Sequence, residues 1–235
     1  MPRFVDAFKA VLFDMNGTFM FEQDRFGADE DFFSTYKALG GSRLTADAVR
    51  TSVLACCAGF SRDYQDAALV DTFPSLAESV RRNSGLNDSL DTDGVVSVIA
   101  HHEVGHVPLW ASDTLIHLSR THAIGVVSNV WAPSSHWRAE LERAGVAGAC
   151  RCMVFSSDGG SIKPSPHLFQ KAARALSVEA CDVLFVGDSL ERDIRPAKAL
   201  GMGTAWVASA GTDSCADVRV ASIAELKDMA HKHER

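Results

Sequence analysis

Several short apolar runs of the sequence end in side chains that can do chemistry. One run ends in Asp14, another in Ser128 and a third in Asp188, while Lys163 follows a further run after a glycine-containing loop. Ligands gather beyond the carboxyl ends of the strands in open parallel sheets. If the runs are neighbouring strands, two carboxylates, a hydroxyl and an ammonium group meet at one edge of the sheet.

The two carboxylates indicate which chemistry this edge could support. Two close carboxylates repel each other unless a cation lies between them, and oxygen ligands with few protein donors suit Mg²⁺. The metal ion, the Lys163 ammonium and the Ser128 hydroxyl could together hold a phosphate group. Asp14 would then be the nucleophile and would form an aspartyl-phosphate.

The runs that carry these side chains have the composition of buried strands. Each is apolar over most of its length, as strands covered on both faces tend to be. Helical patterns lie between the last four runs, and this alternation predicts an α/β fold with a doubly wound (Rossmann-like) parallel sheet. The predicted strands are Ala10–Asp14, Ile124–Ser128, Met153–Ser156, Val183–Gly187 and Thr204–Val207.

The segment after the first strand breaks this rhythm. It contains no clear strand, and its patterns are helical; in one of them Phe32, Phe33, Tyr36 and Leu39 fall on one helical face. We therefore expect an α/β core domain formed by residues 1–18 and 108–235, with an all-helical domain, residues 19–107, inserted into it.

Composition excludes several classes of protein. The 235 residues are 46% hydrophobic and 23% charged, which is typical of a globular domain. The net charge of −7 and the lack of a basic run argue against a nucleic-acid partner. No apolar run is long enough to cross a membrane, and the start is too short and too charged for a signal peptide. The six cysteines form no disulfide-scaffold pattern, so a cytoplasmic location is expected.

Four motifs in order resemble those of the haloacid dehalogenase (HAD) superfamily. "VLFDMNGT" is similar to its first motif, "GVVSN" to the second, "KP" after the glycine loop to the third, and "VLFVGDSLERDIRPAKALGM" to the fourth. Order and spacing agree from Phe4 to about Val207. The helical insert resembles the cap domain of the subfamily with an α-helical cap. "IKPSPHLF" and "GDSLERD" look more like phosphatases than like dehalogenases.

The resemblance implies a role for each motif residue. It makes Asp14 the nucleophile, Ser128 and Lys163 the phosphoryl-binding residues, and Asp188 a direct Mg²⁺ ligand, and it implies that Asp193 supports the metal site or orients Lys163. The expected substrate is a small molecule whose phosphoryl group binds to the core domain. The cap is expected to determine which substrate is accepted. Phe21 and Arg25 follow the first motif and are candidates for contact with that substrate. The predicted phosphate- or substrate-binding residues are Gly17, Thr18, Ser128, Asn129, Lys163, Phe21 and Arg25.

Asn16 departs from the phosphatase pattern. Phosphatases of this superfamily normally have Asp at that position, where it protonates the leaving alkoxide and then activates water. Asn can donate a hydrogen bond but cannot deliver a proton, and losing a general acid–base group typically lowers the rate about 10²–10⁴-fold. The backbone carbonyl of residue 16, which the resemblance makes a metal ligand, is unaffected.

Several interpretations of Asn16 stay open. The protein could be a slow phosphatase or act on a substrate with a good leaving group. It could cleave a carbon–halogen bond, although superfamily dehalogenases do not need Mg²⁺ and lack the Asp188/Asp193 arrangement. It could hydrolyse a phosphonate, for which Lys37 would be the only cap lysine able to form an imine. It could also be a regulatory or binding protein with weakened catalysis, or Asn16 could be a laboratory substitution or a site of deamidation to Asp. A Mg²⁺-dependent phosphatase of a small phosphomonoester is the function that we favour.

The stretch His102–His106 matches the H-E-x-x-H pattern of zinc proteases. That motif needs a continuous helix, which Gly105 and Pro108 disfavour. We therefore expect no zinc site here.

Overall fold

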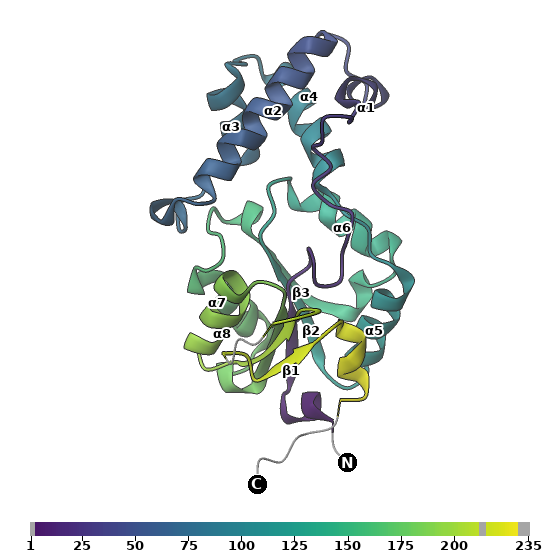
Figure 1. Cartoon of the computed structure of the whole chain (residues 1–235), viewed down its shortest axis with the longest axis vertical. Coiled ribbons are helices and arrows are strands. Elements are labelled where there is room, and N and C mark those ends of the chain that lie inside the picture. Colours follow the sequence, from purple (N-terminus) through teal and green to yellow (C-terminus); the bar gives the residue numbers. More distant parts are fainter. Residues whose placement is uncertain (1–2, 212–214, 230–235) are drawn as a thin grey trace.

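The computed structural model describes residues 3–211 and 215–229, and it contains one parallel sheet of six strands in the order β3-β2-β1-β4-β5-β6 (Figure 1). Every pair of neighbouring strands is parallel. The strands are β1 (Ala10–Phe13), β2 (Ala123–Ser128), β3 (Cys150–Phe155), β4 (Val183–Gly187), β5 (Gly203–Val207) and β6 (Val218–Val220). The five predicted strands are present within a few residues of their expected bounds. The sixth was missed because it has only three residues, one of them the exposed Arg219.

Helices cover both faces of the sheet. Alternate residues of a strand point to opposite faces, and in β1 Val11 and Phe13 pack in one hydrophobic cluster while Ala10 and Leu12 pack in another. The first cluster contains side chains of α5 and α6, and the second those of α7 and α8. This confirms the predicted doubly wound α/β fold. These helices are α5 (Leu109–Ser119), α6 (Ser134–Arg143), α7 (Pro166–Leu176) and α8 (Arg195–Ala199).

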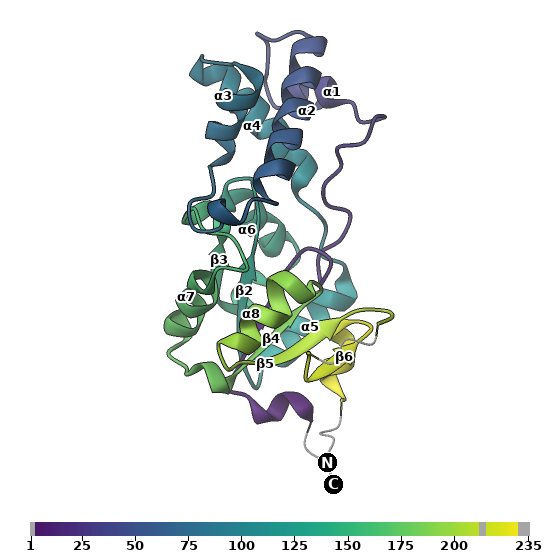
Figure 2. The same cartoon turned by 60° about the vertical axis from the view of Figure 1, so that its left-hand side comes forward.

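The segment between β1 and α5 is helical and stands above the carboxyl edge of the sheet (Figure 2). Its helices share a hydrophobic cluster that includes Phe32, Tyr36 and Phe60, and Ile162 from the loop before α7 joins this cluster. Leu39, expected on the same apolar face, is 50% exposed because α1 ends one residue before it. The limits of the inserted domain, residues 19 and 107, stay a prediction. Its helices are α1 (Phe32–Ala38), α2 (Ala46–Asp63), α3 (Leu76–Ser84) and α4 (Ser89–Glu103).

Two linkers join this helical segment to the sheet, and they run side by side. Phe21 and His106 form an antiparallel bridge, with both backbone hydrogen bonds present. Further along, the amide of Asp24 donates to the carbonyl of Glu103. Across the described residues, we find no helix with the length and apolar character needed to span a bilayer.

Candidate active site

Three adjacent strands bring the predicted site residues together. Asp14 directly follows β1, Ser128 ends β2, and Asp188 directly follows β4. Since β1 lies between β2 and β4, the three side chains reach the same edge of the sheet. The amide of Asp14 also donates to the carbonyl of Val186 at 2.9 Å, which extends the pairing of β1 with β4 to the site itself.

Asp14 is held by two donors that act on the same oxygen atom. The Ser128 hydroxyl donates to Asp14 Oδ1 at 2.8 Å, and Lys163 Nζ donates to the same atom at 2.6 Å. Both donors and Asp14 are buried. Neither bond involves the second carboxylate oxygen, Oδ2.

Lys163 bridges two carboxylates. Its ammonium group also donates to Asp193 Oδ1 at 2.6 Å, and Asp193 Oδ2 accepts from the Ser189 amide at 3.0 Å. Burial by itself would lower the pKa of Lys163, but the charges of Asp14 and Asp193 and their hydrogen bonds outweigh burial and raise this pKa. Lys163 therefore stays charged. The resemblance implies that Asp193 either supports the metal site or orients Lys163. The hydrogen bond from Lys163 to Asp193 is consistent with the second of these roles.

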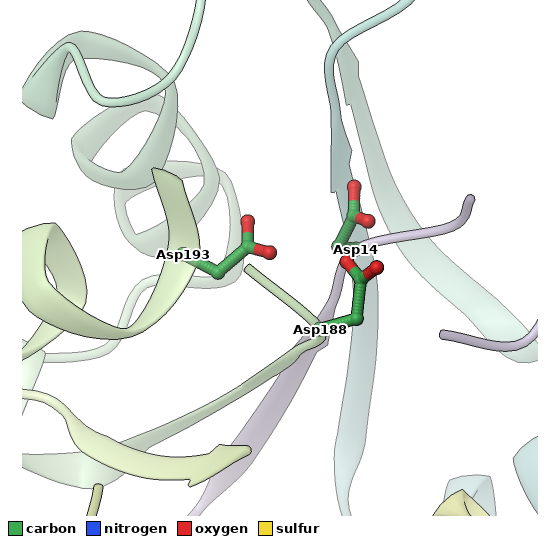
Figure 3. Close-up of side chains that lie close together, drawn as sticks. All are labelled: Asp14, Asp188 and Asp193. Atoms are coloured by element: carbon green, nitrogen blue, oxygen red, sulfur yellow. The ribbon is translucent and has the colours of Figure 1, made fainter. Parts of the chain in front are cut away.

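Asp14, Asp188 and Asp193 form the one group of three acidic, histidine or cysteine side chains within the described residues whose ligand atoms all lie within 4.8 Å of one another (Figure 3). Burial and the nearby charge of Asp14 raise the pKa of Asp188 to about 6. Gly17 has a left-handed φ of +76°, and a Cβ there would lie 2.4 Å from Asp188 Oδ2. A glycine at position 17 thus lets Asp188 approach the first strand.

This donor set fits a hard divalent cation. Carboxylate oxygens are the ligands that Mg²⁺ accepts from proteins, and two carboxylates this close need a positive charge between them. Lys163 forms ion pairs with Asp14 and Asp193 but not with Asp188, and its single charge balances only one of the three carboxylates. Asp188 is therefore the one carboxylate of this cluster that Lys163 does not bind.

Asn16 and Thr18 both place a buried polar atom next to the site. Asn16 Oδ1 and Thr18 Oγ1 have no hydrogen-bond partner within the described part of the chain. Asn16 lines the same cavity as Asp14, whereas Thr18 is fully buried and does not line it. The predicted phosphate contact of Thr18 and Gly17 stays a prediction.

Asn129 lies at the cavity and binds the backbone of Lys163 rather than standing free. Its Oδ1 accepts from the Lys163 amide at 2.7 Å, and its Nδ2 donates to the Lys163 carbonyl at 3.1 Å. The pair fixes the loop that carries Lys163 against the end of β2. Asn129 therefore has a positioning contact in addition to its predicted binding role.

A cavity of about 190 Å³ opens over these groups. Six of the predicted site residues line it, namely Asp14, Asn16, Asn129, Lys163, Asp188 and Asp193. Six further residues line it, namely Asp24, Tyr64, Glu103, Trp131, Ser189 and Arg192. Most of these residues belong to the helical segment, to its linkers or to the loop after β2, where no family motif marks them.

Phe21 and Arg25 do not line this cavity, and their predicted substrate contact stays a prediction. The Phe21 ring packs on Trp110 with a centroid distance of 5.8 Å. The Arg25 guanidinium donates to the carbonyls of Glu22 and Val104 at 2.9 and 3.0 Å, so it ties the two linkers together. Its charge is used to satisfy carbonyls at the end of α4, where cations are favourable.

Glu103 is the least expected member of the cavity wall. Its side chain is buried, and its two oxygens accept from the amides of Trp131 and Ala132 at 2.6 Å each. Burial raises the pKa of this carboxyl to about 8, against the opposing effect of the two amides. The H-E-x-x-H pattern had concealed this role. Because α4 ends at Glu103, His106 lies outside the helix and contacts Arg143 instead.

Comparison with known proteins points to one superfamily. Residues 162–228 match a family model described as HAD-hydrolase-like. Glyceraldehyde 3-phosphate phosphatase of Pyrococcus abyssi is 33% identical over 114 residues, which cover 46% of this chain and 47% of that protein. Pyrimidine 5′-nucleotidase YjjG of Escherichia coli is 26% identical over 183 residues, which cover 73% of this chain and 77% of that protein. This chain thus spans about half the length of the Pyrococcus relative that it matches.

Solved structures agree on the fold. A HAD phosphatase from Thermococcus onnurineus superposes with a TM-score of 0.64 at 23% identity, covering 93% of this chain and 96% of that one. A 2-haloacid dehalogenase from Pseudomonas syringae superposes with a TM-score of 0.67 at 21% identity and the same coverage. The sheet order, the helical segment after β1 and these solved structures show that the chain has the same fold as these proteins, and residues 162–228 resemble the HAD-hydrolase-like family.

Proposed function

We propose that this protein is a Mg²⁺-dependent phosphatase of small phosphomonoesters that acts through an aspartyl-phosphate on Asp14. The observation that carries the proposal is the arrangement around that carboxylate. Ser128 and Lys163 hold Oδ1, Oδ2 receives neither bond, and Asp188 lies beside it at the mouth of a cavity. The named activities of the matched phosphatases from Pyrococcus and Escherichia point in the same direction.

The chain's own residues would hold the metal ion. Asp14, Asp188 and the backbone carbonyl of Asn16 are the proposed ligands. When bound, Mg²⁺ would neutralise the two carboxylates and part of the charge of the phosphoryl group. Asp193 is not needed as a direct ligand, because it is engaged with Lys163 and with the Ser189 amide.

The reaction would run in two displacements at phosphorus. Asp14 Oδ2 attacks the phosphoryl group, the phosphorus–oxygen bond of the ester breaks, and the alkoxide leaves with the bonding electrons. Lys163 stays protonated between its two carboxylates and stabilises negative charge on the phosphoryl oxygens. The alkoxide takes up a proton from solvent. A water molecule then attacks the phosphorus of the aspartyl-phosphate and loses a proton to solvent, and the phosphorus–oxygen bond to Asp14 breaks, which releases inorganic phosphate and restores the carboxylate.

Asn16 limits both steps. Its amide can donate a hydrogen bond to the leaving oxygen but has no proton to transfer. Turnover should therefore be slow for alkyl phosphates and faster for esters whose leaving group is stable as an anion. The cavity of about 190 Å³ is smaller than the typical range of about 300–1,000 Å³ for drug-sized ligands, which supports a small substrate.

One further observation keeps a second candidate in view. A halide leaves without a proton, so Asn16 would be no disadvantage in a dehalogenase. Against this candidate, the cluster of Asp14, Asp188 and Asp193 resembles a metal site that dehalogenation does not need. Phosphonate hydrolysis through an imine is less favoured still, since Lys37 is exposed on α1 and does not line the cavity.

A substrate screen with and without metal separates these functions. The pure protein would be assayed on phosphomonoesters, phosphonates and haloacids in Mg²⁺ and in EDTA, with Asp14→Asn as the control for contaminating activity. We expect phosphomonoester turnover that disappears in EDTA and in the variant. Turnover of a haloacid in EDTA would replace the proposal with dehalogenation, and no turnover of any compound would indicate a binding protein.

A further inference from the structure

Tyr64, at the C-terminal end of α2, joins the helical cap to the core at the edge of the cavity. Its hydroxyl oxygen accepts from Asn129 Nδ2 at 2.9 Å, and its backbone carbonyl accepts from Arg192 Nη2 at 2.7 Å. The Arg192 guanidinium also lies over the Tyr64 ring, 3.5 Å from its centroid. One cap residue is therefore bound in three ways by two core side chains.

The same two core side chains also hold the backbone of Lys163. Its carbonyl oxygen accepts from Arg192 Nη1 at 2.9 Å and from Asn129 Nδ2 at 3.1 Å. A carbonyl oxygen has two lone pairs, so both are in use. The Asn129 amide group has two protons, one for Tyr64 and one for Lys163. Both core side chains that bind Tyr64 therefore also bind the carbonyl of Lys163.

The chain after Tyr64 continues along the loop that carries Lys163. We call residues 64–73 the docking segment. The amide of Ile162 donates to the carbonyl of Val70 at 2.8 Å, and the amide of Phe73 donates to the carbonyl of Gly160 at 2.6 Å. On the other side of Lys163, the Ser165 hydroxyl donates to Asp71 Oδ1 at 2.6 Å. In Figure 1 this end of α2 and the turn after it come down beside the loop that precedes α7.

We propose that Tyr64 is a positioning residue that couples the docked cap to the catalytic geometry of Lys163. The inference rests on the proposed function, because that function gives Lys163 its role at Asp14. Contacts with the docking segment hold the loop on both sides of Lys163, and Tyr64 holds the two side chains that grip its carbonyl. When the cap lifts, the loop loses these contacts and Lys163 loses its fixed place between Asp14 and Asp193.

The coupling matters because Lys163 acts over short distances. Its Nζ lies 2.6 Å from an oxygen of each carboxylate, and a displacement of about 1 Å at a reacting centre can cost about 100-fold in rate. An enzyme built in this way would be fully competent only with the cap docked, when the cavity is also closed to water. Arg192 and Tyr64 would thereby restrict the reaction to bound substrate.

The test compares Tyr64 with the other tyrosine of the chain. Tyr36 also lies in the cap, where its hydroxyl accepts from the amides of Arg43 and Leu44 at 3.1 and 3.2 Å, and Tyr36 does not line the cavity. Tyr64→Phe, Tyr64→Ala and Tyr36→Phe would be assayed with p-nitrophenyl phosphate and Mg²⁺. Hydrogen–deuterium exchange of the full chain would be followed at residues 158–165 by mass spectrometry.

We expect Tyr64→Phe to lower kcat about fivefold, the size of one lost hydrogen bond, with KM within twofold of the wild type. Tyr36→Phe should keep both constants. Tyr64→Ala should raise exchange at residues 158–165 about tenfold while α7 exchanges as in the wild type.

Three results would overturn the coupling. They are wild-type exchange at residues 158–165 in Tyr64→Ala, a uniform rise over the whole chain, and a change in KM alone. If the wild type hydrolyses no phosphomonoester, the proposed function fails, but the exchange measurement still decides whether Tyr64 holds the Lys163 loop.

Discussion

The two walls of the cavity differ in how they are built. The core wall lies at the carboxyl edge of the sheet, and Asp14 and Asp188, which directly follow β1 and β4, are fixed there by the register of the sheet. The cap wall contains Asp24, Tyr64 and Glu103, which come from a linker and from two helix ends. Sheet register is a local and repetitive property, whereas the cap wall exists only when two separately packed units meet. The core wall should therefore govern chemistry, and the cap wall should govern positioning and stability.

The largest expected effect is at the nucleophile. Asp14→Asn should lower phosphatase turnover by about 10⁴-fold or more, because no covalent intermediate can form. The side chain keeps its shape, and we expect the melting temperature to change by only a few degrees. Turnover of p-nitrophenyl phosphate checks the rate, and calorimetry checks the fold. Residual activity above about one per cent of the wild type would remove Asp14 from the nucleophile's role.

Metal dependence should follow from Asp188. Asp188→Ala should lower turnover about 10³-fold at low Mg²⁺ and raise the Mg²⁺ concentration needed for half-maximal rate, since one carboxylate ligand is lost. Asp182→Ala is a suitable control, because Asp182 pairs with Lys9 at the opposite edge of the sheet. An unchanged Mg²⁺ requirement in Asp188→Ala would contradict the proposed ligand set.

A gain of activity is expected at position 16. Asn16→Asp restores a carboxyl group that can protonate the leaving oxygen and should raise kcat for alkyl phosphates about 100-fold. The gain should be smaller for p-nitrophenyl phosphate, whose leaving group needs no proton. The measurement is the increase in kcat on Asn16→Asp for an alkyl phosphate divided by the increase for p-nitrophenyl phosphate. Equal gains for both substrates would indicate a structural rather than an acid–base effect.

The smallest expected effect concerns the cap wall and is a change of stability with pH. Burial raises the pKa of Glu103 from its ordinary value of 4.5 to about 8. Between these values the folded protein binds a proton that the unfolded chain has released, so folding stability is full below about pH 4.5 and falls as the pH rises to about 8. The total loss is on the order of a few kcal/mol. Glu103→Gln cannot titrate and should lack this loss.

Melting temperatures of the wild type and Glu103→Gln at pH 5 and pH 9 would measure the effect. The wild type should lose stability relative to the variant between the two values. Glu140→Gln is the control, because burial would raise the pKa of Glu140 but hydrogen bonds from Arg143 and the Val107 amide lower it. Because its pKa is lowered in the folded protein, the Glu140 carboxylate should stabilise the fold at neutral and high pH and should lose this contribution only when the pH falls. A constant difference between the wild type and Glu103→Gln would show that Glu103 stays ionised in the fold.

The sequence by itself determined the core. Strand-length apolar runs alternating with helical patterns predicted the doubly wound sheet, because burial on both faces leaves an apolar signature along the chain. The same runs located Asp14, Ser128 and Asp188, since a side chain just beyond a parallel strand can only lie at the carboxyl edge. Lys163 was found from its position after the glycine loop.

Only the tertiary structure decided the cap wall and the partners of each charge. Glu103 appeared to belong to a zinc motif, yet its neighbours are backbone amides that come 28 and 29 residues later. The Arg25 guanidinium binds carbonyls of the two linkers, and Arg192 and Tyr64 meet across 128 residues of sequence. A buried carboxylate or a guanidinium is stabilised by whichever groups the fold brings within hydrogen-bond distance. Those groups are set by how the cap docks on the sheet, which leaves no periodic signal in the chain.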